Sequence, residues 1–262
     1  MIINLVMIQF PSLFGLSDGS MAARISFVMV GLWWFGFAQI TFRVLPQEIK
    51  PDRQEDLLKK GFQELKKVWT ALQSQVNLKR FLFSFFFYSA GVQTVLYLAS
   101  TFATKELDFD ATGLIILILL LQFLAILGAI IFARVSDWKG NKAAIFVMLI
   151  IWMAICVASY LVQESITFYA IAGAVGLVMG GIQSLSRSTY SKLLPENTAD
   201  TASYFSFYDV LEKVATVLGT FSFGYIDLFM GGMRNSILVL IVYFVIGMII
   251  LATVRVKRAG VA

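Results

Sequence analysis

The sequence predicts an all-α protein, a polytopic membrane helix bundle with about seven whole transmembrane spans and one partial span. Of its 262 residues, 59% are hydrophobic and 14% are charged, whereas soluble globular domains carry about 25% charged residues. The apolar residues form long uncharged runs, most of which reach the roughly 20 residues that cross a bilayer core. Lysine and arginine gather on alternate sides of these runs, which supports the number of spans.

The first 44 residues contain the partial span and one whole span. Residues 1–16 are apolar and uncharged but short, and they contain Pro11. They also lack the basic start of a signal peptide. A turn at 17–20 leads to a second span over 24–42. We expect residues 1–44 to be the last one and a half helices of an otherwise missing N-terminal bundle, and the chain to be a fragment of a longer protein.

Residues 45–80 form the one long hydrophilic stretch. After Pro46 and Pro51, apolar residues recur three or four positions apart, at Leu58, Phe62, Leu65, Trp69, Leu72 and Val76. This spacing predicts an amphipathic α-helix with lysines on its opposite face. Two interpretations stay open: a cytoplasmic helix lying on the membrane surface or against the bundle, and a solvated linker helix.

Six further spans are predicted within 81–258, which we expect to form a six-helix transmembrane bundle. They cover residues 81–104, 112–133, 143–163, 167–185, 205–226 and 236–254. In this topology Arg24, Lys105 and Arg234 lie on one side of the membrane, and the other 18 of the 21 basic residues lie on the opposite side. By the positive-inside rule that second side, which holds the C-terminus, is cytoplasmic.

The chain is therefore expected to be an integral multi-pass protein of the plasma (inner) membrane, with the lipid bilayer as a partner. Topology explains the net charge of +5, so nucleic acid is not an expected partner. The chain has no histidine, which is the commonest general base and metal ligand, and its single cysteine, Cys156, lies in an apolar run. We expect no enzyme activity, no catalytic residue, no metal site and no cofactor.

Charged side chains come closest to the membrane around the fifth and sixth of the whole spans. Arg187 follows the 167–185 span, while Asp209, Glu212 and Lys213 lie near the start of the 205–226 span. Charges at such depth are costly and mark functional sites. Arg187 is predicted either to anchor at lipid headgroups or to pair with Asp209 or Glu212 and close an inner gate. An alternative pair joins Asp209 to Lys213, four residues later on the same helix.

Uncharged polar side chains also lie within predicted spans. Gln93 and Tyr97 share one helical face, and Gln122 and Gln183 lie in later spans. Polar groups at this depth need partners or a water-filled cavity, so all four are candidates for the substrate pathway, with interhelical hydrogen bonding as the alternative.

Glycines in the fifth of the whole spans predict a close helix contact. They are Gly173, Gly176, Gly180 and Gly181. They lie largely on one helical face, where the missing side chains let a neighbouring helix approach closely.

Residues 133–142, ARVSDWKGNK, resemble the major facilitator loop signature G-x-x-x-D-R-x-G-[RK]-[RK]. Asp137, Gly140 and Lys142 match, whereas positions 133, 138 and 141 depart. The resemblance implies a cytoplasmic contact in which the carboxylate accepts hydrogen bonds from the N-terminal amides of a neighbouring helix. In that family the contact stabilises one face of the alternating-access cycle. An ordinary basic turn is the alternative.

A second resemblance runs from GGIQSLSRS at 180–188, through Pro195, to SYFSFYDVLEKVATVLG at 203–219. It is similar to the pattern of the "unknown major facilitator" family, which is related to vacuolar amino-acid effluxers of fungal autophagy. Ser184, Ser206 and Thr220 depart from that pattern. The resemblance covers most of the chain and implies the C-terminal half of a major facilitator fold, with two inverted three-helix repeats.

The function that this resemblance implies is secondary active transport of a small-molecule solute by alternating access. Amino-acid efflux is suggested through the fungal relatives. A proton or a sodium ion is the expected coupling partner, and Asp209 and Glu212 are the candidate proton carriers. A non-transporting membrane scaffold or accessory subunit is the alternative function.

Overall fold

The computed structural model describes residues 2–44, 57–195 and 200–255. Within them the chain is helical and contains no strand. Six of the described helices are long and apolar enough to cross a membrane. These observations confirm the predicted all-α polytopic membrane bundle. The start of the predicted 45–80 segment and the basic residues Lys257 and Arg258 lie outside the described residues.

The chain divides into two compact units, residues 1–56 and 57–262. The first contains α1 (Ile2–Gln9), a short 3-10 helix (Pro11–Phe14) and α2 (Gly19–Val44). α1 packs against α2, with Met7 and Ala22 buried between them. The carboxylate of Asp18 accepts a 2.7 Å hydrogen bond from the Met21 amide, which satisfies one of the free amides at the start of α2. The assignment of this unit to an N-terminal bundle stays a prediction.

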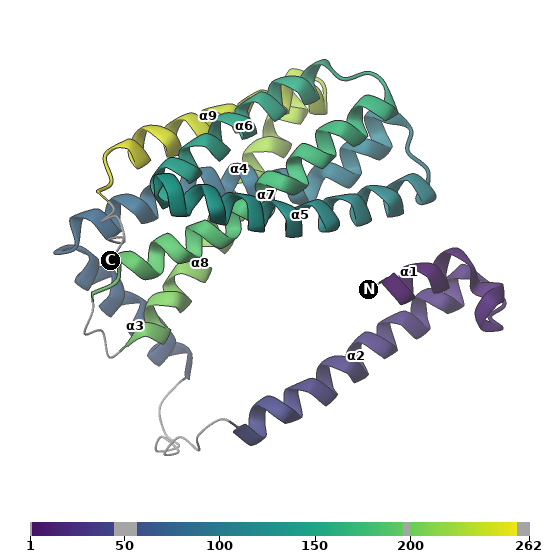
Figure 1. Ribbon diagram of the computed structural model, residues 1–262, viewed down its shortest axis with the longest axis horizontal. Helices are drawn as coiled ribbons and strands as arrows, with labels where there is room; N and C mark the ends of the chain where they lie inside the picture. The colour runs from purple at the N-terminus through teal and green to yellow at the C-terminus, as the bar shows by residue number, and fades with distance from the viewer. Residues whose placement is uncertain (1, 45–56, 196–199, 256–262) are drawn as a thin grey trace. The chain divides into compact units, whose positions relative to one another are not determined.

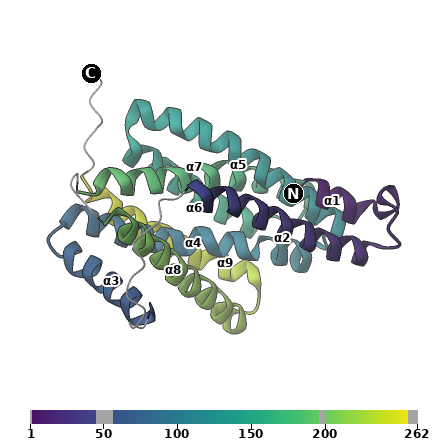
Figure 2. The ribbon, with the colours of Figure 1, turned by 90° about the horizontal axis from the view of Figure 1, so that it is seen from below.

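The described residues of the second unit form the helices α3 to α9 (Figures 1 and 2). They are α3 (Leu57–Leu72), α4 (Val76–Leu107), α5 (Ala111–Lys139), α6 (Asn141–Leu161), α7 (Ser165–Leu193), α8 (Thr201–Met230) and α9 (Met233–Ala252). Each of the six later predicted spans falls on one helix from α4 to α9. The helices extend beyond the apolar runs: α4 begins before Lys79, and α7 continues past Arg187. Lysine and arginine are good helix formers, so charge ends the apolar run without ending the helix.

The span count differs from the predicted seven whole spans at α8. This helix has 30 residues but is not one of the six span candidates in the described parts of the chain. It carries Asp209, Glu212, Lys213 and Asp227, and these charges lower its hydropathy. α8 still packs against α4 and α9, so it belongs to the bundle.

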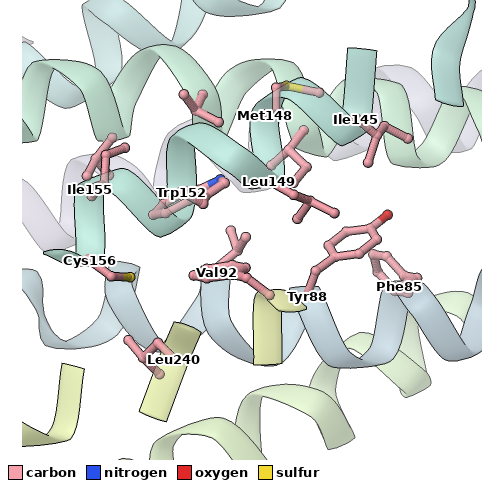
Figure 3. Packing of buried hydrophobic residues seen from close by; sticks show 14 of the residues in the cluster. Phe85, Tyr88, Val92, Ile145, Met148, Leu149, Trp152, Ile155, Cys156 and Leu240 are labelled. Carbon is pink, nitrogen blue, oxygen red and sulfur yellow. The ribbon is translucent and has the colours of Figure 1, made fainter. Parts of the chain in front are cut away.

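The core lies where α4, α6 and α9 meet. Trp152 of α6 is fully buried and stacks on Phe244 of α9, with ring centroids 5.6 Å apart. Figure 3 shows Val92 and Tyr88 of α4 next to Leu149 and Trp152 of α6. In a membrane such rings hold helices together by close packing and not by removal from water.

α5 and α7 form the closest helix pair of the bundle. A Cβ atom on Gly180 of α7 would collide with the carbonyl of Ala125, and one on Gly128 of α5 would collide with the carbonyl of Leu177. A Cβ on Gly176 would lie 2.7 Å from the carbonyl oxygen of Leu121. Backbone therefore meets backbone along this contact, which confirms the close approach that the glycines predict.

α3 lies against the starts of α4 and α8 (Figure 2). Val68 and Leu72 are buried there. The side chain of Gln75 donates a 3.1 Å hydrogen bond to the Tyr204 hydroxyl. Glu64 accepts a 2.5 Å hydrogen bond from Lys67, which holds the pKa of the Glu64 carboxyl below its usual value.

Replacing Gly180 with alanine is expected to destabilise the bundle by about 1–3 kcal/mol, because the added methyl group forces α5 and α7 apart. Thermal unfolding in detergent measures the effect. Gly224→Ala in α8 is the matched control, since nothing lies within 4 Å of its added Cβ. Equal stability of the two variants would contradict the close contact.

Candidate functional site

A polar cavity of about 430 Å³, including its mouth, lies among α4, α7 and α8. Four of the predicted site residues line it: Gln93, Gln183, Arg187 and Glu212. Gln93 and Gln183 are predicted for the substrate pathway, whereas Arg187 and Glu212 are predicted for the charge network. The fold therefore joins the two predicted sets in one place.

Gln93 and Glu212 connect α4 to α8 inside this cavity. The Gln93 amide donates a hydrogen bond to a Glu212 carboxylate oxygen, and both side chains are only partly exposed. The carboxylate thus has one polar partner on the opposite wall. Because a carboxylate accepts several hydrogen bonds, Glu212 keeps capacity for a further donor in the cavity.

Arg187 and Asp209 form an ion pair between α7 and α8. Their nitrogen and oxygen lie 2.9 Å apart, and the side chains are 55% and 51% exposed. The guanidinium also lies over the Tyr208 ring, 5.6 Å from its centroid. Asp209 therefore pairs across helices, and the alternative pair with Lys213 on the same helix is not formed. A half-exposed pair contributes little stability, so it separates easily.

Tyrosine and serine hydroxyls complete the cavity. The hydroxyls of Tyr88 and Ser186 lie 2.7 Å apart and are buried, and Tyr208 forms part of the wall. The sequence reasoning missed these residues, because tyrosine and serine in an apolar helix usually pack. Ser89, which also lines the cavity, lies four residues before Gln93 on the same helical face, so extending that face by one turn would have identified it.

The other seven predicted site residues do not line this cavity: Asp209, the three residues that match the loop signature, and three more. Tyr97 of α4 is 60% exposed, and Gln122 of α5 and Lys213 of α8 are exposed as well. None of them lines the cavity. Their roles in a substrate pathway or charge network stay predictions.

The signature-like loop between α5 and α6 is held by Asn141. This side chain is buried. Its carbonyl accepts hydrogen bonds from Ser136 (2.7 Å) and Lys192 (3.0 Å). Its amide donates to Ser188 (3.2 Å) and Thr189 (3.1 Å). Asn141 stands where the signature has a basic residue, and it joins the ends of α5, α6 and α7.

The residues that match the signature play different parts. Gly140 has a φ of +87°, which favours glycine, and its amide donates to the Ser136 carbonyl at 2.8 Å. Lys142 donates to the carbonyls of Ala252 (2.7 Å) and Val254 (2.8 Å) at the end of α9. Asp137 is exposed, and its side chain has no hydrogen bond or ion pair with another described residue. Lys142 and Asn141 contact neighbouring helices, whereas the contact expected for the Asp137 carboxylate stays a prediction.

Metal binding has no evident site in the parts of the chain that the structure describes. Among them, no group of three or more His, Cys, Asp or Glu side chains is placed to hold a metal ion. The chemistry that the cavity offers is hydrogen bonding and charge pairing.

Comparison with known proteins gives a match over the whole chain. The family described as "Vacuole effluxer Atg22 like" matches residues 1–262, which confirms the resemblance to vacuolar effluxers. An effluxer is a transporter, so the expectation that this is no enzyme family is confirmed too.

Individual relatives agree with this match. The chain is similar to the "Uncharacterized MFS-type transporter YxiO" of Bacillus subtilis, at 28% identity over 235 residues, covering 90% of the chain and 54% of the relative. It is similar to Autophagy-related protein 22 of Cryptococcus neoformans, at 26% identity over 268 residues, covering 93% and 46%. It is also similar to Autophagy-related protein 22 of Kluyveromyces lactis, at 25% identity, covering 90% of the chain and 52% of the relative. The chain spans about half the length of the curated relatives it matches.

Asn141→Ala is expected to destabilise the bundle by about 1–3 kcal/mol, because it leaves buried hydroxyl groups without their partner. Thermal unfolding in detergent is the measurement. Asp137→Asn, four residues earlier on the exposed side of the same loop, is the control and is expected to unfold like the unchanged protein. An Asn141→Ala variant as stable as the control would show that Asn141 is not the anchor.

Proposed function

The chain belongs to the family described as vacuole effluxer Atg22 like, and on that premise we propose that it forms half of a secondary active transporter for amino acids. The observation that carries the proposal is the polar cavity, where Arg187 and Glu212 place opposite charges on the walls of one space. An amino acid carries one carboxylate and one ammonium group, and the two charges of the cavity match them. Amino-acid efflux is also the activity that the fungal resemblance suggests.

Each cavity group has a part in recognising such a solute. The planar guanidinium of Arg187 suits a carboxylate, which it binds with two parallel hydrogen bonds. The Glu212 carboxylate accepts a hydrogen bond from the ammonium group of the solute. The Gln93 amide, on the opposite helix, holds the Glu212 carboxylate in place through its own hydrogen bond. The apolar wall residues Phe85, Val92 and Ile182 leave room for an apolar side chain.

Transport follows when the walls of the cavity separate and close. Arg187 is held by Asp209 through a half-exposed ion pair, so an incoming carboxylate competes with Asp209 for the guanidinium. In this proposal the pair is the inner gate, and it opens as the solute binds. The close α5–α7 contact and the Asn141 cluster keep the rest of the bundle rigid during the movement.

The proposal includes a second bundle of helices facing this one, since transporters of this architecture bind their solute between two halves. A proton carried by Glu212 or Asp209, or a sodium ion, drives the cycle. By the positive-inside rule we predict a cytoplasmic C-terminus, and the plasma membrane stays the predicted location. A non-transporting scaffold, the alternative, has no need of opposite charges in a shared cavity.

Glu212→Gln and Arg187→Gln are each expected to reduce amino-acid efflux by roughly tenfold or more, because losing a hydrogen bond to a charged group costs about 1.5–3 kcal/mol. Efflux of labelled amino acids from vesicles that contain the full-length protein is the measurement. Asp227→Asn, which neutralises a carboxylate at the far end of α8, is the matched control. Full efflux in all three variants would contradict the proposed site, and an unchanged protein that moves no amino acid would contradict the proposed substrate.

Lys213→Ala is a separate test of the predicted charge network. If Lys213 belongs to that network, the variant folds normally and loses transport. Its yield and thermal unfolding report folding, and the same vesicle assay reports transport. Unchanged transport would remove Lys213 from the functional residues and would leave the Arg187–Asp209 pair unaffected.

A further inference from the structure

An apolar groove lies on the outside of the bundle, between α3, α4 and α8 and apart from the polar cavity. Its space amounts to about 470 Å³. Aromatic and aliphatic side chains form its walls, namely Trp69, Leu82, Phe83, Phe86, Phe207 and Leu211. The Trp69 ring lies 6.5 Å from the Phe83 ring and 6.3 Å from the Phe207 ring, so the walls hold each other in place.

One charged side chain, Lys79, borders this groove. Its ammonium group donates to the side-chain carbonyl of Gln73 at 3.3 Å, and no described carboxylate forms an ion pair with it. Lys79 and Arg80 are the last charged residues before the uncharged run 81–104. Lys79 is therefore at headgroup level, and Leu82, Phe83 and Phe86 follow at the depth of the acyl chains.

The outer face of α3 continues this arrangement. Lys59 and Lys66 border the apolar face of α3 and do not lie opposite it as predicted. With Phe62 and Trp69 they are spaced three, four and three residues apart and form one stripe along the helix. All four are exposed, Phe62 by 74% and Trp69 by 44%. Lysines alternating with aromatic rings are typical of helices that lie in the headgroup region of an anionic membrane.

We propose that the groove binds an anionic phospholipid, with an acyl chain between α3, α4 and α8 and the phosphate at Lys79. Water has no hydrogen-bonding partner in such a slot, whereas an acyl chain fills it and gains contact area. The ammonium group of Lys79 at its border selects a negative headgroup. A lipid in the groove contacts Phe207 and Leu211 of α8. Because the same helix carries Asp209 and Glu212, the position of α8, and with it the polar site, depends on which lipids the membrane contains.

Native mass spectrometry of the full-length protein tests this proposal. The delipidated protein is titrated with dioleoyl phosphatidylglycerol or dioleoyl phosphatidylcholine, which differ in headgroup charge and share their acyl chains. The unchanged protein is expected to retain the anionic lipid in preference. Lys79→Gln is expected to reduce that preference about fivefold, the effect of one lysine near an anionic surface, while still binding both lipids. Leu211→Trp, which fills the groove, is expected to lose both.

Lys139→Gln removes the same charge from the exposed end of α5 and is the matched control, expected to behave like the unchanged protein. The proposal is overturned if Lys79→Gln keeps the full preference, if Lys139→Gln loses as much, or if Leu211→Trp binds as the unchanged protein does. It is also overturned if the unchanged full-length protein retains neither lipid, which would mean that another part of the protein covers the groove.

Discussion

The lack of water inside the hydrocarbon core is the constraint on which this structure depends. A polar group there has to find its partner within the protein, and the second unit collects its polar side chains accordingly. One group gathers around Glu212 and Gln93. A second gathers around Asn141, where four side chains share one buried amide. At the other end of α4, Arg234 of α9 pairs with Glu106 at 2.9 Å and donates to the Val162 carbonyl after α6.

The proposed transport cycle assigns different roles to these contacts. The glycine contact of α5 with α7, the Asn141 cluster and the Lys142 contact with the end of α9 hold their helices through buried or backbone groups. α8 carries three carboxylates and one lysine, and it contacts α7 near one end, by way of Asp209, Tyr204 and Tyr208. The proposed alternating-access cycle uses both kinds of contact, since a half must move as a body while its gate opens.

The departures from the family signature have a physical explanation. Asn141 replaces a basic residue, yet an amide both donates and accepts, so it joins serine, threonine and lysine partners that a lysine at the same place would not. Lys142 keeps the basic character and satisfies carbonyls that the end of α9 leaves open. The loop thus serves to fasten helices, although Asp137, the residue most typical of the signature, makes no such contact.

The sequence by itself determined the helical class, the position of each helix in the second unit and the glycine face, because hydrocarbon thickness, helical period and backbone clearance act locally along the chain. It also singled out Arg187, Asp209 and Glu212 as candidate functional residues, because placing a charge near the membrane interior costs free energy. Only the tertiary structure decided that Arg187 forms its ion pair with Asp209 and that the Tyr88 hydroxyl is hydrogen-bonded to that of Ser186. It also decided that Tyr97 and Gln122 lie outside the cavity. A transmembrane helix such as α5 is apolar on every side, so its sequence does not fix its rotation about its own axis. Packing against neighbouring helices sets that rotation, and with it the side chains that face each other.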